Sequence, residues 1–471
     1  MKKLFLKSTF ILGTSLLGLV AMAGCGGGEN NNKTDVLNIV CLNKGYGRAW
    51  IDDLVKVWES ENPGYTVNLQ ALASADELIK KDIYKRDNPD DLYIGNSKDW
   101  KTYASQDKFL ALDDFLDEKV DGMTIKEKIK EEYGKSIYYG GHTYRLPWTS
   151  GVPGIYYNSK MFEKNGWSVP TTYEELVALC NTISSSHIKI DPYGPNNDKN
   201  YVKPFIFHDQ TYYFDYAVFT WWGQLAGKAA IDDFLKYESA QTFSSANPAF
   251  NKLGEALNLW YGIFGNEANY VSGSLSLSYE LAQQSFWNGS AAMICSTDWI
   301  YNEVLDYTDS GKFADDFDIK LMKTPIAPNA ADSHISYVVG EDNYFAIPKS
   351  SIKADKAKSF IKLMISDRGI ETFTNKARGT MAYKTSSSIV VQDPYVQSLN
   401  EYLDNATNRF TNWSDSKLFL KNQIDIWTDN EFGKPYNRII GQNPITVDEC
   451  MKLLSQWAAS KWSDWESKAG N

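Results

Sequence analysis

Apolar strands alternate with amphipathic helices early in the chain, and this alternation limits the fold more than any other feature of the sequence. Strands are predicted over residues 36–42, 67–72 and 92–94. After the first strand, apolar residues recur at helical spacing until an Asn-Pro-Gly sequence at 62–64 ends the helix. A second helix is expected after Ser74, with Glu77 completing a capping box. Repeated strand–loop–helix units form an α/β sheet with helices on both faces.

Polar residues follow two of these strands. In open α/β sheets, ligands bind beyond the carboxyl ends of the strands. The loops at those ends carry Lys44, Tyr46, Asn96 and Asp99. We therefore expect these four side chains to face a ligand, the alternative being solvated turns.

The segment from Gly141 to Leu176 separates one packed body from the next. A Gly-Gly turn at 140–141 joins two short strands, and Pro147 ends the second. Residues 148–154 contain two glycines and a proline, which predict a bending connection rather than a buried strand. A strand then starts at residue 155, and a helix is predicted after Thr172 and Glu175, which form a capping box. Residues 379–383 have the pattern of another extended crossing.

The first 24 residues have the pattern of a lipoprotein signal peptide. Three lysines precede an apolar run over 10–22, which is too short to span a bilayer comfortably. Residues 23–25 (AGC) then match a lipoprotein cleavage site, so Cys25 is the predicted lipidation site and residues 25–35 a flexible tether. This pattern predicts a protein held at the extracellular face of the cell membrane; an uncleaved anchor helix is the alternative.

The net charge limits the possible binding partners of the protein, and the chain length limits its number of domains. The formal net charge is −11 over 471 residues, and an acidic surface argues against nucleic acid or anionic lipid as a partner. The length allows two or three domains. Four widely spaced cysteines beyond Cys25 fit buried apolar positions better than a disulfide framework, although a single bridge remains open.

The aromatic content is high, with 15 Trp, 29 Tyr and 22 Phe, or 14% of the chain. Fifteen tryptophans exceed what a core requires. Pyranose rings have apolar C–H faces and a polar rim of hydroxyls, so flat aromatic rings stack on the faces while amides and charges meet the rim. Carbohydrate binding is therefore one physical reason for this composition.

Common enzyme and cofactor patterns are absent from the sequence. The four histidines lack metal-ligand spacing, and no Cys-x-x-Cys, Walker-type loop or Gly-x-Ser-x-Gly occurs. The acidic pairs at 90–91, 113–114 and 315–316 are sequence neighbours, which point to opposite faces of a strand and suit a glycosidase poorly. We expect no enzyme activity, no cofactor and no bound metal.

Five short sequences stand in the order found in one protein family: 141–147 (GHTYRLP), 157–162 (YNSKMF), 170–176 (PTTYEEL), 288–293 (NGSAAM) followed by Trp299, and 357–361 (AKSFI). Because of these motifs and their order, the chain resembles the extracellular solute-binding proteins of ABC importers. The branch it resembles is the sugar-binding one that includes maltose-binding protein. The resemblance implies a two-lobed α/β fold of periplasmic-binding-protein type II, with three crossings and a ligand cleft. Lobe one would comprise residues 36–146 with 325–380, and lobe two residues 147–324 with 381–471.

The resemblance also implies site residues. Lys44 and the loop from Asn96 to Asp99 match sugar contacts, and Trp299 matches a stacking ring. The segment with Tyr213, Trp221 and Trp222 falls where another stacking ring usually lies, and Trp427 is a candidate near the C-terminus. Trp221 and Trp222 are adjacent on a helix, so one is expected in the core and the other toward the cleft.

Three further candidates remain, two of them at the crossings and one in the loop before Trp299. Trp148 either stacks on ligand or packs at the hinge, and Tyr383 belongs to the later crossing. Asp298 either accepts hydrogen bonds from sugar hydroxyls or caps the next helix.

The implied function is a lipid-anchored, non-catalytic, monomeric protein that captures an oligosaccharide and delivers it to an ABC permease with a separate ATPase. A secreted polysaccharide hydrolase and a binder of another solute, such as a peptide or metal chelate, are the alternatives.

Overall fold

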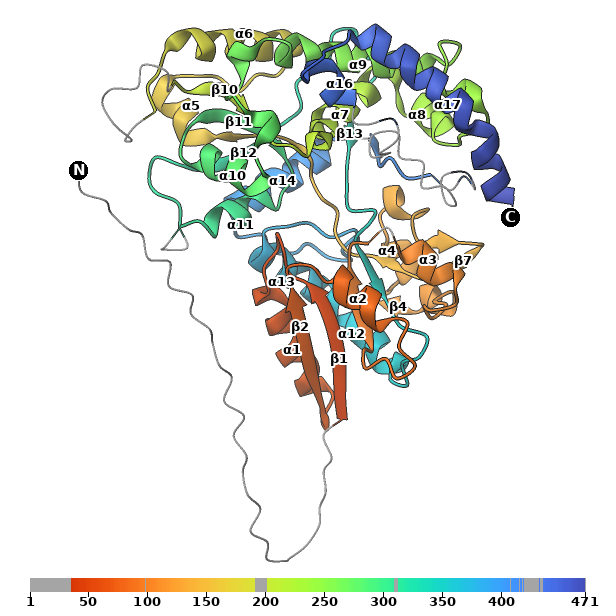
Figure 1. Cartoon of the computed structure of the whole chain (residues 1–471). Helices are drawn as coiled ribbons and strands as arrows, with labels where there is room; N and C mark the ends of the chain where they lie inside the picture. The colour runs from red at the N-terminus through yellow and green to blue at the C-terminus, as the bar shows by residue number, and fades with distance from the viewer. Residues whose placement is uncertain are drawn as a thin grey trace, which may run out of the picture.

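The computed structural model describes residues 35–97, 99–190, 201–308, 312–406, 408–414, 416, 418, 432 and 435–470. These residues form two lobes, one above the other in Figure 1. The first strands and helices, in red and orange, lie in the lower lobe, which we call lobe one. No helix among the described residues is both long and apolar enough to cross a bilayer.

Lobe one is built on a five-stranded sheet in the order β2-β1-β3-β14-β8. β1 (Asp35–Leu42) pairs in parallel with β2 (Tyr65–Leu72) and with β3 (Leu92–Gly95). β14 (Tyr344–Ala346) is antiparallel to β3 and to β8 (Leu146–Pro147). A strand that follows the whole sheet of lobe two in sequence therefore completes lobe one.

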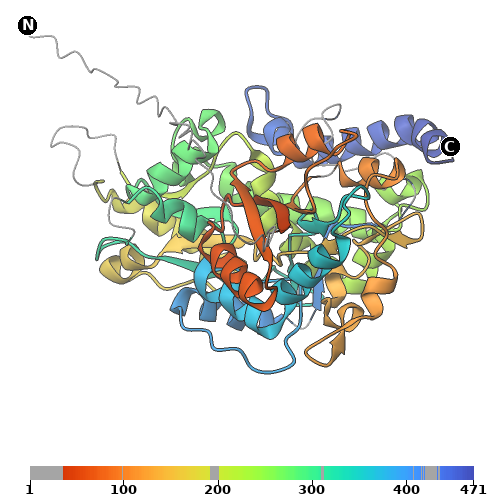
Figure 2. The same cartoon turned by 90° about the horizontal axis from the view of Figure 1, so that it is seen from below.

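Helix α1 (Ala49–Glu61) packs against α12 (Ala354–Ile365) and α13 (Asp367–Ala377). Figure 2 shows the red helix α1 beside these cyan and blue helices. Its buried residues recur at the predicted helical spacing: Trp50, Ile51, Leu54 and Trp58. The short helices α2 (Asp76–Asp82) and α3 (Trp100–Ser105) follow β2 and β3, but Ser74 does not cap α2, contrary to the prediction.

Lobe two is built on a four-stranded sheet in the order β10-β11-β9-β12. Its strands are β9 (Gly154–Asn158), β10 (Lys203–Ile206), β11 (Ala291–Ser296) and β12 (Ile319–Met322). The main helices are α5 (Ser159–Asn165), α6 (Tyr173–Ser186), α7 (Asp215–Ala226), α9 (Pro248–Phe264), α10 (Tyr279–Trp287), α11 (Ile300–Leu305), α14 (Pro394–Asn405) and α17 (Val447–Gly470). α7 is almost wholly buried and packs against α9.

Two sequence predictions, one in lobe two and one across both lobes, are confirmed. Both halves of the capping box at the start of α6 are formed, because Thr172 and Glu175 each accept the backbone N–H of the other. The cysteines at positions 41, 180, 295 and 450 are buried and free, as expected for apolar packing residues rather than a disulfide framework.

Three segments connect the lobes, at residues 148–153, 338–343 and 379–383, and they lie side by side. The backbone N–H of Ser150 donates to the carbonyl of Thr380 over 2.9 Å. Gly151 and Val339 exchange backbone hydrogen bonds of 2.8 and 3.2 Å. We call these three hydrogen-bonded segments, 148–153, 338–343 and 379–383, the strap. It lies beneath the space between the lobes.

The second crossing lies later than the predicted boundary at 324/325. Residue 326 pairs with Thr172 of lobe two, and the N–H of Ala327 donates to Gln224 of α7 over 2.8 Å. β13 (Ile335–Tyr337) packs on α7 and pairs in parallel with β15 (Asn408–Phe410). Residues 325–337 therefore pack with lobe two, because their apolar side chains join its core.

Candidate ligand-binding cleft

A cavity of about 730 Å³ lies between the lobes, next to the second crossing. Lobe one lines it with the loops at the carboxyl ends of β1, β2 and β3. Lobe two lines it with the start of α7 and with residues of α10 and α11. The volume lies within the usual range for small-molecule sites.

The wall from lobe one follows from the parallel sheet, whose strand ends meet at one edge. Lys44, Tyr46, Asp76 and Asn96 all line the cavity there. Burial raises the pKa of the Asp76 carboxyl to about 6. Its Oδ1 has no hydrogen-bond partner within the described part of the chain. This wall therefore offers an amine, an amide and a partly desolvated carboxyl to a ligand.

The wall from lobe two is a cluster of aromatic rings held by polar contacts. The Trp299 indole N–H donates to the Tyr279 hydroxyl over 3.0 Å, and that hydroxyl donates to Glu303. The Gln283 amide also donates to Glu303 over 2.7 Å, while burial raises the pKa of this carboxyl. Tyr213 stands 5.4 Å from the Tyr279 ring between centroids. The rings are thus fixed before any ligand arrives.

The two lobes touch at one side of the cavity. Gly45 lies against Trp299 so closely that a Cβ at position 45 would stand 2.9 Å from the Trp299 Cβ. The Lys44 ammonium lies 3.7 Å from Glu280 of α10 and 5.4 Å from the centre of the Tyr279 ring. The positive φ of Gly45, +83°, also disfavours any larger residue there.

A second inter-lobe contact lies beside the cavity residue Asn412. Asn412 lines the cavity, and the following residue, Trp413, stacks on Trp100 of lobe one at 5.9 Å between centroids. The buried Arg145 guanidinium lies 4.1 Å from the Trp100 ring and 5.0 Å from the Trp413 ring. Burial lowers the pKa of Arg145 to about 10, which the acidic side chains of Asp342 and Glu341 oppose.

The family model of bacterial extracellular solute-binding proteins matches residues 44–371. The chain belongs to this family. The resemblance drawn from the five sequence motifs is thereby confirmed.

Among curated proteins, this solute-binding protein is similar to the multiple sugar-binding protein of Streptococcus mutans, with 26% identity over 182 residues. That match covers 38% of this chain and 41% of the relative, so it spans about two fifths of the relative's length.

Solved structures support the fold over almost the whole chain. An ABC substrate-binding protein from Listeria monocytogenes in complex with cycloalternan has a TM-score of 0.64 at 16% identity, covering 91% of this chain and 99% of that one. RafE in complex with raffinose has a TM-score of 0.62 at 15% identity, covering 91% and 99%. The two-lobed type II α/β fold is thus confirmed.

Six predicted site residues within the described part of the chain do not line the cavity, and five of them are buried within the protein. Trp221 and Trp222 are both in the core, where their indole N–H groups donate to the carbonyls of Pro325 (2.9 Å) and Ala249 (2.8 Å). The expectation that one of them faces the cleft is therefore corrected, because α7 is covered on all sides.

Of the other three, Trp148 and Tyr383 lie in the strap beneath the cavity, and Asp298 of lobe two packs against it. Trp148 is fully buried and packs against Tyr46 and Phe345. The Tyr383 hydroxyl donates to the carbonyl of Pro147 over 2.7 Å. Asp298 accepts the N–H of Val152 over 3.0 Å, and burial raises its pKa to about 6. Tyr383 and Asp298 thus bond to backbone groups at the first crossing, and none of the three side chains lines the cavity.

The remaining candidates divide as follows. Lys44, Tyr46, Asn96, Tyr213 and Trp299 line the cavity, whereas Asp99 lies outside it, 3.6 Å from Lys80. Trp427 and Cys25 lie outside the described residues. Sequence reasoning missed Tyr279, Glu303 and the acidic residues 341–342, which carry no motif and follow no predicted strand of lobe one. It also missed Asp76, which comes after the predicted strand 67–72 and was expected only as part of the helix that follows Ser74.

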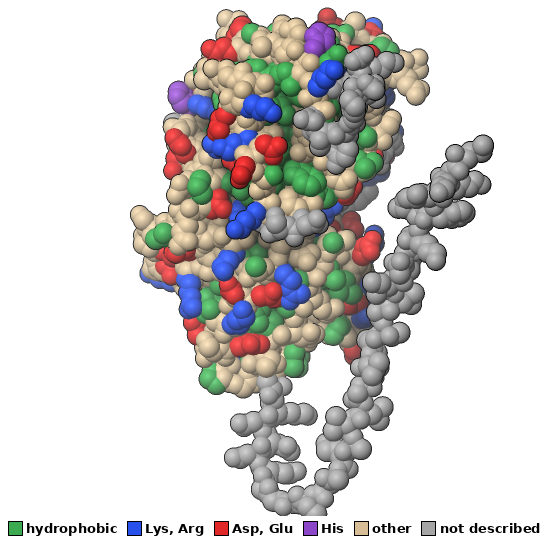
Figure 3. All heavy atoms as spheres, turned by 90° about the vertical axis from the view of Figure 1, so that its left-hand side faces the viewer, with side chains coloured by type: hydrophobic (Ala, Val, Ile, Leu, Met, Phe, Trp, Pro, Cys, Tyr) green, Lys and Arg blue, Asp and Glu red, His purple; other side chains and the backbone are tan. Residues whose placement is uncertain are grey.

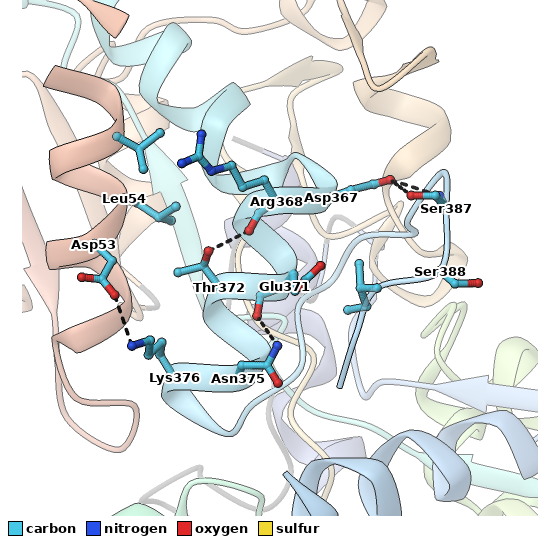
Figure 4. A pocket seen from close by; sticks show the side chains of 12 residues that line it. Asp53, Leu54, Asp367, Arg368, Glu371, Thr372, Asn375, Lys376, Ser387 and Ser388 are labelled. Atoms are coloured by element: carbon cyan, nitrogen blue, oxygen red, sulfur yellow. Dashed lines mark hydrogen bonds and ion pairs between the residues drawn. The ribbon is translucent and has the colours of Figure 1, made fainter. Parts of the chain in front are cut away.

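A smaller hollow of about 470 Å³ lies between α1 and α13 of lobe one and the segment with Ser387 and Ser388 that follows the third crossing (Figure 4). Its polar groups already have partners: Asp53 faces Lys376 over 3.4 Å, and Asp367 accepts the hydroxyls of Ser386 and Ser387. A ligand bound there would not contact lobe two. No group of three or more potential metal ligands occurs within the described part of the chain.

Proposed function

We propose that this solute-binding protein captures an oligosaccharide between its lobes and delivers it to an ABC permease that carries a separate ATPase. The observation behind the proposal is the cavity itself, in which fixed aromatic rings stand beside carboxyl and amide groups. Rings stack on the apolar faces of a pyranose, while carboxylates and amides bind its hydroxyls. The names of similar proteins, which include a multiple sugar-binding protein and complexes with raffinose and cycloalternan, support a sugar.

Five of the sequence candidates make up the proposed site. Lys44, Tyr46 and Asn96 would contact the sugar from lobe one, and Tyr213 and Trp299 from lobe two. A ligand that contacts both walls favours the arrangement in which they are close, which is the state a permease would recognise. Micromolar binding corresponds to about −8 kcal/mol, which a few stacked rings and charge-assisted hydrogen bonds can supply.

The location is part of the proposal. Lipid attachment at Cys25, after removal of residues 1–24, would hold a monomer at the outer face of the cell membrane, with residues 25–35 as the tether. Mass spectrometry of the protein purified from its native membrane would test this, since a diacylglyceryl group on Cys25 is expected. An intact N-terminal methionine with unmodified Cys25 would contradict it.

A melting-shift screen against defined oligosaccharides tests the sugar hypothesis. We expect one or a few glycans to raise the melting temperature and to narrow the scattering curve of the protein as the lobes close. Stabilisation by peptides or metal chelates, with no response to any glycan, would favour another solute.

An assay for catalysis distinguishes a binding protein from the alternative of a polysaccharide hydrolase. Purified protein incubated with glucans, xylans and mannans is expected to release no reducing ends, even where it binds the polymer fragments. Reducing ends that accumulate with time, and disappear in cavity variants such as Glu303→Gln, would overturn the binding-protein proposal.

A further inference from the structure

The described residues that line the cavity have an unequal charge balance. Their acidic members are Asp76, Asp215, Glu303, Glu341 and Asp342, against the single amine of Lys44. Lys44 lies at the side of the cavity where the lobes touch, 3.7 Å from Glu280. Its charge is therefore already matched by a carboxylate, and the walls present a net negative surface to a ligand.

The carboxylates come from both lobes and from the second crossing. Asp76 comes from lobe one, Asp215 and Glu303 come from lobe two, and Glu341 and Asp342 come from the second crossing. Asp215 accepts a hydrogen bond of 2.5 Å from Tyr436, and Glu303 accepts from Tyr279 and Gln283. Donors from the protein thus hold two of the carboxylates in place on the lobe-two wall.

Arg145 is a buried cation that interacts with Glu341 and Asp342 of the second crossing, but it does not face a ligand in the cavity. Arg145 is fully buried and does not line the cavity, because its guanidinium is stacked on Trp100 and Trp413. The outer surface differs: on the face shown in Figure 3, acidic and basic side chains are interspersed. Acidic residues outnumber basic ones five to one among the described lining residues, against 59 to 48 in the whole chain, so the acidic bias is stronger in the cavity.

We propose that the cleft selects its sugar by charge. It accepts oligosaccharides that are uncharged or carry a protonated amine, and it rejects those that carry a carboxylate, sulfate or phosphate. Hydroxyl and ammonium groups donate to carboxylates, whereas an acidic group would stand among like charges. This inference rests on the proposed function, since it concerns which sugars the same cavity takes.

Calorimetry with matched tetrasaccharides tests the inference. The probes are α- and β-linked tetramers of glucose, glucosamine and glucuronic acid, together with galactose and galacturonic acid. Wherever the neutral tetramer binds, we expect its uronic counterpart to bind at least about 100-fold more weakly and the amine counterpart at least as tightly. A uronic tetramer that binds within tenfold of its neutral match, or alone, would overturn the charge rule while leaving sugar capture intact. Failure of all tetramers and of the wider glycan screen would instead remove the proposed function, and the charge rule with it.

A charge-removing variant sharpens the test. In Glu341→Gln/Asp342→Asn, the ratio of neutral to uronic affinity should fall at least about tenfold, because two of the five carboxylates are neutralised. The matched control is Asp232→Asn/Asp233→Asn on the surface of lobe two, where the same two-charge change should leave the ratio within twofold. An unchanged ratio in the first variant, or an equal change in the control, would contradict the inference. If the double variant folds poorly, Asp342→Asn alone, at a half-buried position, should still lower the ratio measurably.

Discussion

The same three kinds of side chain occur in two neighbouring regions of the molecule, with different consequences. The cleft wall holds Trp299, Tyr279 and Glu303, whose polar ends bond to one another. The strap beneath it, with the lobe-two residue that packs against it, has three residues of the same or similar type: Trp148, Tyr383 and Asp298. There, the Tyr383 hydroxyl donates to a backbone carbonyl and Asp298 accepts a backbone N–H.

The difference shows what makes an aromatic cluster available to a ligand. In the cleft, side chains satisfy one another and the rings remain at the cavity surface. In the strap, the polar groups join separate crossings and the rings are covered, with Trp148 and Asp298 both fully buried. The two clusters contain similar residue types. What distinguishes the structural one is that the polar ends of its side chains are buried against backbone groups.

The largest expected effect separates the two tryptophans by stability. Trp148→Ala should lower the free energy of unfolding by about 3–5 kcal/mol, because a fully buried indole is lost from the packing of both Tyr46 and Phe345. Chemical denaturation measures this. Trp299→Ala, the matched change in the cleft, should cost clearly less. Equal losses in the two variants would mean that the cleft ring is as structural as the strap ring.

The second expected effect concerns the affinity for sugar, which should depend on the tryptophan in the cleft. Trp299→Ala should weaken sugar binding at least tenfold, which is about 1.4 kcal/mol or more, because a stacking face is removed from the cavity. Calorimetry with the glycan found by the screen measures this, and circular dichroism establishes that the variant is folded. Trp222→Ala in the core controls for loss of an indole, and its folded fraction should bind within about twofold of the wild type. Undiminished affinity in folded Trp299→Ala would remove this residue from the proposed site.

The sequence could predict the lobe-one wall but not this distinction between clusters. Lys44, Tyr46 and Asn96 follow strands of a parallel sheet, and the geometry of such sheets brings strand ends together. Trp148, Trp221 and Trp222 are the same residue type as Trp299 in the cleft, so residue type does not separate them. Only tertiary packing decides that α7, which carries Trp221 and Trp222, is covered on every side. The capping box at Thr172 was predictable because it is local, whereas the late boundary of lobe two depends on β13 pairing with β15, far along the chain.

The third prediction concerns pH and the acid in each cluster. Burial raises the pKa of Asp298 from 3.8 to about 6, so the folded state holds this proton more tightly than the unfolded state. The resulting stabilisation is complete below about pH 4 and is lost as the pH rises through about 6, with a slope of at most about 1.4 kcal/mol per pH unit. Asp298→Asn should remove this component from stability measured between pH 4 and 7.

The matched change in the cleft is Glu303→Gln. Burial also raises the pKa of Glu303, and the same sign applies, so its removal should likewise flatten the fall in stability with rising pH. Unlike Asp298→Asn, it should also change sugar affinity, because Glu303 lines the cavity. An affinity change in Asp298→Asn as large as that in Glu303→Gln would contradict the division between strap and cleft.

The smallest expected effects come from removing one hydroxyl in each region. Tyr383→Phe deprives the carbonyl of Pro147 of its buried donor and should cost about 1 kcal/mol of stability, with affinity unchanged. Tyr279→Phe removes the link between the Trp299 indole and Glu303, so the ring loses its fixed orientation and affinity should fall a few-fold. Denaturation and calorimetry on both variants give a two-by-two comparison. Because each change deletes one oxygen atom and keeps the ring, a loss of affinity in Tyr383→Phe with none in Tyr279→Phe would reverse the assignment of the two clusters.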